Sequence, residues 1–345
     1  MLDFLVDRKS LELLDMQGWS LLFAEARACG LTARLATELL DDAPESMPAG
    51  LRAQALSAFR QSEALALDVR RELRHIEAAL KALDTRIVLL KGAAYIAADL
   101  PAARGRIFSD IDVLVDKDFL GRAEAALMLG GWVAHHTSEY DRRYYREWSH
   151  EIPPMVHMRR NTVIDLHHSL VMPTCRIRVD VRPMLDAVVP IPGPGNWFRL
   201  GDEDMVLHAA SHLLLNAEFD RGLRDLWDID ILLRHFGAIR PDFPERVLER
   251  AKTVGLAPIA RTAFTLCSLR FGTDLPREAL AGGGVVMRLV ETATNTRHPV
   301  TRPRWQLLAD SLLSYREMYM RLPWHLLVRH LHHKTGQAMK QLRVH

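Results

Sequence analysis

Hydrophobic positions in the first part of the chain recur every three or four residues. This spacing holds from residue 10 to about residue 40 and again from 51 to 83, where Ala, Leu, Glu and Arg are abundant, and it is typical of amphipathic helices. The intervening residues 41–50 include prolines and a glycine, which interrupt helices. The sequence therefore predicts two long helices in an N-terminal helical region over residues 1–84.

The pattern changes at residue 85. A short apolar run over 86–90 precedes Lys91 and Gly92 and then a helix-like alanine-rich stretch, which predicts a strand, a turn and a helix. Residues 109–115 alternate polar and apolar, as a half-buried strand does. The further elements predicted are a helix over 119–129 and strands over 154–158 and 162–170. The last two strands are expected to form a mostly antiparallel return, and a small α/β domain is expected over residues 85–200.

Helical spacing returns after residue 200. The predicted helices cover 203–215, 223–236, 245–254, 258–269 and a last stretch after residue 304. The proline- and glycine-rich segment 190–195 can continue neither a helix nor a strand, so it is the expected boundary before a C-terminal helical domain over 201–345. The fold class predicted is α/β (α+β).

Charge and cysteine usage narrow the class of protein. The 345 residues contain 45 Lys and Arg against 43 Asp and Glu, a formal net charge of +2, so the whole surface is not a polyanion-binding one. The three cysteines are far apart and form no metal-binding pairs. The N-terminus lacks the pattern of a secretory signal, and no apolar run reaches the ~20 residues that a membrane span needs. We therefore expect a cytoplasmic protein.

The pair Asp110 and Asp112 is the strongest candidate for chemistry. Residues two apart on a strand face the same side, so the two carboxylates project together. They repel each other unless a cation lies between them, and Mg²⁺ is commonly held by one or two carboxylates plus substrate phosphates. Asn at either position is expected to leave the fold intact or slightly more stable. The competing interpretation is a solvent-facing strand edge with ordinary acids.

Two further segments support the metal interpretation. Lys91 and Gly92 lie where a strand ends and a helix starts, a position where backbone amides and a lysine can hold phosphate. Downstream, Asp165 interrupts an apolar strand and is either a third metal ligand or an edge-strand acid. With the first pair, it would complete a cradle for two metal ions.

Taken together, five segments resemble one family. They are Leu89–Gly92, Arg106–Val115 with its Ser109-Asp110-Ile-Asp112 element, Ile164–His167, His208-x-x-x-His212 and Leu223–Asp228. This set resembles the uncharacterised bacterial nucleotidyltransferases of the DNA polymerase β superfamily, over about residues 85–235. The resemblance implies a small mixed sheet with helices on one face.

The resemblance also implies an activity: Mg²⁺-dependent transfer of a nucleoside monophosphate from an NTP to a hydroxyl-type acceptor, with release of pyrophosphate. The acceptor is left open among small molecules, RNA and protein. Asp110, Asp112 and Asp165 would be the catalytic and metal-binding residues. The nucleotide-binding residues would be Lys91, Gly92, Arg106 and Ser109.

The chain departs from that family at the phosphate turn. The superfamily commonly has Gly-Ser with the first acids soon after it. This sequence has Gly92-Ala93, and Asp110 lies as far as 18 positions after Gly92 (110 − 92). Lys91 and Ser109 are expected to replace the missing hydroxyl. The departure motivates a second hypothesis: a non-catalytic module of the same fold that binds a peptide or a protein partner in its cleft.

Other segments leave alternatives open. Arg224 and Asp228 are spaced for a salt bridge within one helix, while Arg224 or Asp225 could instead point across the cleft. The residue types of 140–151 suit either a nucleotide clamp or a surface strand, and those of 321–345 either a solvated helix or a nucleic-acid or lipid contact. His157, His167 and His168 raise a minority hypothesis, a metallohydrolase.

Overall fold

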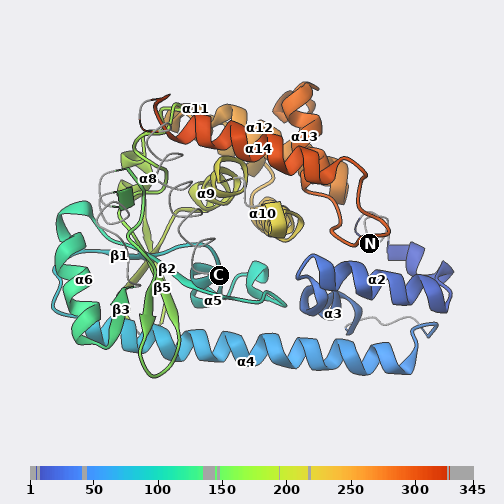
Figure 1. Ribbon diagram of the computed structural model, residues 1–345, viewed down its shortest axis with the longest axis horizontal. Helices are drawn as coiled ribbons and strands as arrows, with labels where there is room; N and C mark the ends of the chain where they lie inside the picture. The colour runs from blue at the N-terminus through green and yellow to red at the C-terminus, as the bar shows by residue number, and fades with distance from the viewer. Residues whose placement is uncertain are drawn as a thin grey trace, which may run out of the picture.

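A mixed sheet at one end of the molecule is combined with two groups of helices (Figure 1). The computed structural model describes residues 5, 8–40, 45–134, 144–145, 148–193, 195–216, 219–324 and 326. Helix α4 (Ala49–Leu80) runs along the base, beneath both the sheet and the other N-terminal helices. Helix α14 (Gln306–Arg321) lies across the opposite side of the molecule.

Seven strands within the described residues form one sheet in the order β3-β4-β5-β2-β1-β7-β6. Their bounds are β1 (Ile87–Leu89), β2 (Ile111–Leu114), β3 (Trp132–Ala134), β4 (Met155–His157), β5 (Val163–His167), β6 (Val189–Pro190) and β7 (Trp197–Arg199). The pairs β2–β5 and β1–β7 are parallel, and the other neighbours are antiparallel. The predicted α/β class with a mixed sheet is confirmed.

The N-terminal helices differ from the prediction in one respect. Residues 10–40 form α2 (Met16–Ala28) and α3 (Thr32–Leu40) instead of one long helix. The break falls at Gly30, whose φ of 67° is left-handed and therefore ends α2. The remaining helices before residue 200 are α5 (Lys91–Ala97), α6 (Leu120–Leu129) and α8 (Arg182–Asp186).

The C-terminal part of the described chain is helical, as predicted. Its helices are α9 (Asp202–Leu215), α10 (Gly222–Ile239), α11 (Phe243–Val254), α12 (Ala257–Phe271), α13 (Val285–Ala293) and α14. Helix α13 was not predicted. It is only nine residues long and follows three consecutive glycines, so it contains too few turns for the spacing of hydrophobic residues to indicate a helix.

Segment 190–195, the expected domain boundary, lies inside the sheet. It connects β6 to β7, which pair with each other, and β7 then pairs with β1. Apolar side chains from α2, the sheet and α12 belong to one continuous buried cluster. The division into three regions at residues 84 and 200 therefore stays a prediction. Within the described residues, no helix is long and apolar enough to cross a membrane.

Candidate active site

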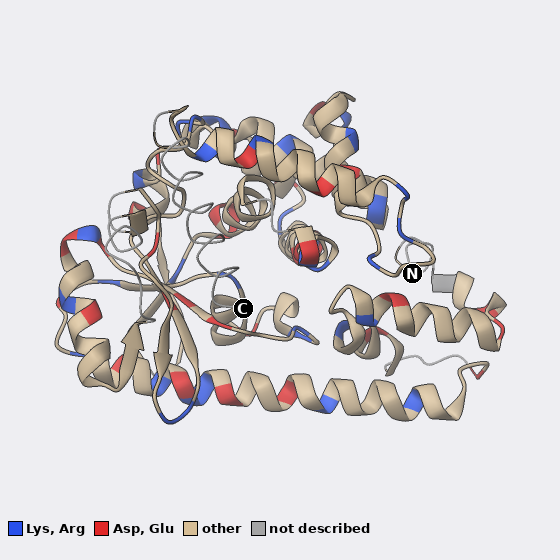
Figure 2. Ribbon diagram, viewed as in Figure 1, with Lys and Arg blue, Asp and Glu red and all other residues tan. Residues whose placement is uncertain are grey.

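One cleft of about 640 Å³ is lined by all seven residues that the sequence predicted for the catalytic, metal-binding and nucleotide-binding roles. The seven are Lys91, Gly92, Arg106, Ser109, Asp110, Asp112 and Asp165. Its other walls come mainly from the C-terminal helical part and from residues 144–145 and 149–151. Acidic and basic residues both occur in the region between the sheet and α10 (Figure 2). The cleft is therefore polar and carries charge of both signs.

The pairing of β2 with β5 brings two of the three predicted acids together. Asp112 on β2 lies directly opposite Asp165 on β5 in the parallel register. Both strands are in the interior of the sheet, so the edge-strand interpretation of these acids is wrong. Asp110 precedes β2, which begins at Ile111, and reaches the cleft from the loop before the strand.

Lys91 and His167 both contact the carboxylate of Asp112. Its Oδ1 lies 3.2 Å from Lys91 Nζ and 3.0 Å from His167 Nε2. Burial alone would raise the pKa of Asp112, but Lys91 and the His167 hydrogen bond outweigh it and hold the pKa well below its usual value. The same contact raises the pKa of His167 against the opposing effect of burial. Asp112 is thus ionised and held in place.

Asp165 has the opposite environment. Burial, followed by the charges of Asp112, Glu151 and Asp110, raises its pKa to about 7. Its Oδ1 is buried and has no hydrogen-bond partner among the described residues. A carboxylate in this position is stabilised by an added cation, and a set of carboxylate oxygens suits Mg²⁺. The residues present therefore fit the metal that the sequence implied.

The turn at Lys91 and Gly92 is closely packed. Lys91 has a φ of 42°, a left-handed conformation that costs a non-glycine residue about 1–2 kcal/mol. A Cβ on Gly92 would lie 2.6 Å from Arg106 Nη1 and 2.6 Å from the Phe108 ring. Gly92 is therefore required by the close approach of the Arg106 side chain, a reason that the sequence did not show.

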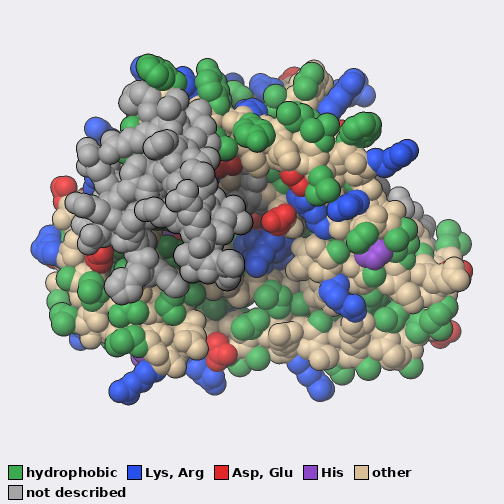
Figure 3. Space-filling model, in the orientation of Figure 1, with side chains coloured by type: hydrophobic (Ala, Val, Ile, Leu, Met, Phe, Trp, Pro, Cys, Tyr) green, Lys and Arg blue, Asp and Glu red, His purple; other side chains and the backbone are tan. Residues whose placement is uncertain are grey.

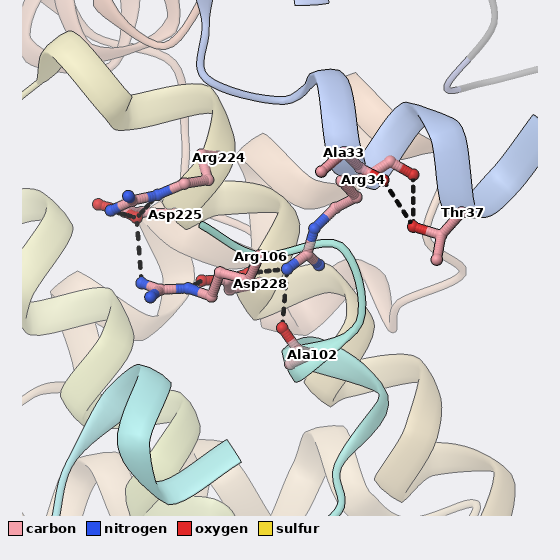
Figure 4. Close-up of polar contacts among 8 residues, drawn as sticks. All are labelled: Ala33, Arg34, Thr37, Ala102, Arg106, Arg224, Asp225 and Asp228. Carbon is pink, nitrogen blue, oxygen red and sulfur yellow. Dashed lines mark hydrogen bonds and ion pairs between the residues drawn. The ribbon is translucent and has the colours of Figure 1, made fainter. Parts of the chain in front are cut away.

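Arg106 is held by acids of α10 (Figure 4). Its Nε donates to Asp228 Oδ2 at 2.7 Å, and its Nη2 lies 3.7 Å from Asp225 Oδ1. The other oxygen of Asp228 accepts from Arg34 Nη2 at 2.8 Å. Arg34, Asp228 and Arg106, which we call the arginine bridge, connect α3 to the cleft through α10.

The arginine bridge bears on two predictions, the partner of Arg224 and the direction of Asp225. Arg224 pairs with Asp225 at 2.6 Å, and its expected pairing with Asp228 is wrong because Asp228 is occupied by the two other arginines. Asp225 does reach across toward Arg106, as the alternative interpretation expected.

Comparison with known proteins identifies the family. A family described as uncharacterised nucleotidyltransferase matches residues 15–272, about three quarters of the chain. The chain belongs to this nucleotidyltransferase family. No curated protein matches it. Among solved structures, it is similar to the solution structure of the antibiotic-resistance factor ANT(2'')-Ia, at 14% identity, 52% coverage of this chain, 94% coverage of that chain and a TM-score of 0.32.

Sequence reasoning missed the basic side of this nucleotidyltransferase cleft. Arg221, Arg297 and Arg321 line it from the C-terminal part. Arg221 Nη1 donates to Ser109 Oγ at 3.3 Å, which ties the helical part to the predicted Ser109. Basic side chains gather beside acidic ones near the centre of the face in Figure 3. No motif in the sequence connects these arginines, because they are up to 100 residues apart (321 − 221).

Two predicted segments lie only partly within the described residues. Of the aromatic and basic segment 140–151, the structure describes 144–145 and 148–151, where Tyr144, Tyr145, His150 and Glu151 line the cleft. Of the basic tail 321–345, it describes only 321–324 and 326.

Proposed function

We propose that this protein is a Mg²⁺-dependent nucleotidyltransferase that moves a nucleoside monophosphate from an NTP to an acceptor hydroxyl and releases pyrophosphate. Family membership supports the reaction class. The single observation that carries the proposal is the meeting of Asp110, Asp112 and Asp165 in one cleft, with a buried Asp165 oxygen that has no partner. Such an arrangement is costly in the absence of a cation.

In this proposal the carboxylates have two tasks. Asp110 and Asp112 bind the divalent metal at the triphosphate. Mg²⁺ bound there would neutralise phosphate charge and lower the pKa of the acceptor hydroxyl. Asp165, whose pKa is raised to about 7, would hold the metal at the acceptor, orient the acceptor hydroxyl and help to take its proton. The acceptor oxygen forms a bond to the α-phosphorus, the bond from phosphorus to the pyrophosphate oxygen breaks, and pyrophosphate leaves.

The positively charged side chains of the cleft differ in how free they are to contact phosphate. Lys91 is 15% exposed and paired with Asp112, so it holds that carboxylate in place and contacts phosphate with its remaining donors. Arg106 is engaged by Asp228 and positions the turn at Gly92. Arg221 is exposed and bonded to the Ser109 hydroxyl, so it is the side chain we assign to the outer phosphates.

The proposal is tested by separating binding from transfer. Calorimetry with each NTP, with and without Mg²⁺, is expected to show binding that depends on the metal. With α-labelled NTP and a screen of acceptors, Asp165→Ala should keep Mg-NTP binding and lose transfer by about 10²-fold or more. Asp110→Asn should lose both. The matched control is Asp118→Asn, an exposed acid outside the cleft, which should change neither.

Two outcomes would overturn the proposal. Normal transfer in Asp165→Ala would remove the third carboxylate from the chemistry. An absence of Mg-dependent binding of any NTP would favour the non-catalytic module that binds a peptide or a protein partner.

A further inference from the structure

A second group of ligand-type side chains lies beside the three acids. His150, Glu151 and His167 each offer one ligand atom, and these atoms lie within 4.8 Å of one another. Glu151 Oε2 is 3.5 Å from His167 Nε2 and 3.7 Å from His150 Nε2. His157 and His168, the other histidines that the sequence suggested, do not belong to this group.

The backbone holds the group in place. Glu151 faces His167 as an isolated antiparallel bridge, and the amide of Ile152 donates to Leu166 O at 3.0 Å. The amide of His168 donates to His150 O at 2.8 Å. The segment that carries two of the ligands is therefore fastened to the end of β5, which carries the third. Little rearrangement is needed to bring the three side chains onto one ion.

We propose that His150, Glu151 and His167 bind one divalent first-row transition-metal ion, such as Zn²⁺ or Co²⁺, with Asp112 as a fourth ligand. Bonds of about 2.1 Å place neighbouring ligand atoms about 3.0–3.4 Å apart around such an ion. The spacings of 3.0 Å from His167 Nε2 to Asp112 and 3.5 Å to Glu151 are close to this range. The ion would replace the direct 3.0 Å contact between His167 Nε2 and Asp112 Oδ1.

The donor set distinguishes this ion from Mg²⁺. Two imidazoles with carboxylates suit Zn²⁺, Co²⁺ or a similar ion, whereas Mg²⁺ prefers oxygen ligands. The His150 ring is buried and its Nε2 lies 3.7 Å from Glu151 Oε2, so it supplies one of these imidazole donors. The side chain of Glu151 is 27% exposed and lines the cleft, which gives an ion a route to the site.

The surroundings also limit the affinity. Nδ1 of His150 and of His167 is buried and has no hydrogen-bond partner among the described residues. Tightly held metal sites usually have an acceptor at that nitrogen, and loss of one costs about 10–100-fold in affinity. We therefore expect a reversible site rather than a permanently filled structural one.

The test is a Co²⁺ titration followed by visible absorption, repeated with Zn²⁺ by calorimetry. Because His330, His332 and His333 of the tail can also bind such ions, the background protein carries alanine at all three. We expect one ion per chain in this background. His150→Ala should weaken binding at least about tenfold. Glu151→Gln, a conservative change at a partly exposed position, should do the same without loss of folding.

The controls separate this site from the proposed Mg²⁺ site. His235→Ala, a histidine of α10 outside the group, should leave Co²⁺ binding unchanged. His150→Ala should keep Mg-NTP binding, and Asp110→Asn should keep Co²⁺ binding while it loses Mg-NTP. Displacement of Co²⁺ by an equal concentration of Mg²⁺, or unchanged Co²⁺ affinity in His150→Ala and Glu151→Gln, would overturn the inference.

Discussion

The arginine bridge and the acids of the cleft are two buried sets of charged groups, and they differ in how well their carboxylates are paired. In the arginine bridge, each oxygen of Asp228 accepts a hydrogen bond from a different arginine, Arg34 or Arg106. Among the acids of the cleft, Asp112 contacts Lys91 and His167, while Asp165 has a buried oxygen with no hydrogen-bond partner in the described structure. A buried carboxylate with an arginine on each oxygen leaves no open position for a ligand, whereas one with an unpartnered oxygen is available to bind a cation.

The two sets are also connected. Arg106 belongs to the bridge and packs against Gly92 beside the acids, so α3 supports the cleft from a distance. Arg34 and Asp228 are 194 residues apart in the sequence. The N-terminal helices therefore contribute to the geometry of a site to which, among the described residues, they supply no lining side chain. Three substitutions test the comparison.

The largest effect is expected from Asp228→Ala. It leaves Arg34 and Arg106 buried without their shared carboxylate, a type of change that typically costs about 3–5 kcal/mol of unfolding free energy. Urea denaturation measures it. The matched control is Arg71→Ala, which breaks the exposed pair with Asp68 and should stay within about 0.5 kcal/mol. A loss below about 1 kcal/mol in Asp228→Ala would show that the bridge is not a stabilising network.

Asp165→Asn should have the opposite effect on stability. The pKa of Asp165 rises from 3.8 to about 7 on folding, so the folded protein binds more protons than the unfolded chain in this window. Stability is therefore present at low pH and lost as the pH rises toward 7 and above. In EDTA at pH 8, Asp165→Asn should be more stable than the parent by at most about 4 kcal/mol. The difference in stability between the variant and the parent should disappear near pH 4. Equal stability of the two proteins at pH 8 would contradict the inference that ionised Asp165 destabilises the fold.

Asp112→Asn is expected to produce the smallest of the three changes. The sequence predicted a neutral or slightly stabilising effect, because the two nearby acids repel. The structure reverses the sign, since ionised Asp112 is stabilised by Lys91 and His167 and its pKa lies well below 3.8. At pH 7 the variant should lose about 1–2 kcal/mol, measured by the same urea titration. The difference should shrink as the pH falls through the folded pKa. If Asp112→Asn is more stable than the parent, repulsion between Asp110 and Asp112 outweighs the contacts with Lys91 and His167.

The local spacing of hydrophobic and polar residues was sufficient to predict most helices and strands near the site. The alternation over 109–115 predicted β2 and placed Asp110 and Asp112 on one side, and all seven predicted site residues line the same cleft. Their roles stay predictions. The pattern failed at Gly30, where a left-handed residue divides a helical stretch, and at α13, which is short. The breakers at 190–195 lie between the paired strands β6 and β7, and the division of the chain into regions stays a prediction.

By itself, the sequence determined the α/β class, the family resemblance and the identity of the candidate acids, because these depend on residue type and short-range spacing. Only the tertiary structure decided which charges are matched. The register that sets Asp112 beside Asp165, the pairing of Arg34 with Asp228 and the approach of His150 and Glu151 to His167 join segments through sheet pairing and packing. The pKa of a buried group depends on such neighbours and on burial, and neither can be read from the group's own position in the chain.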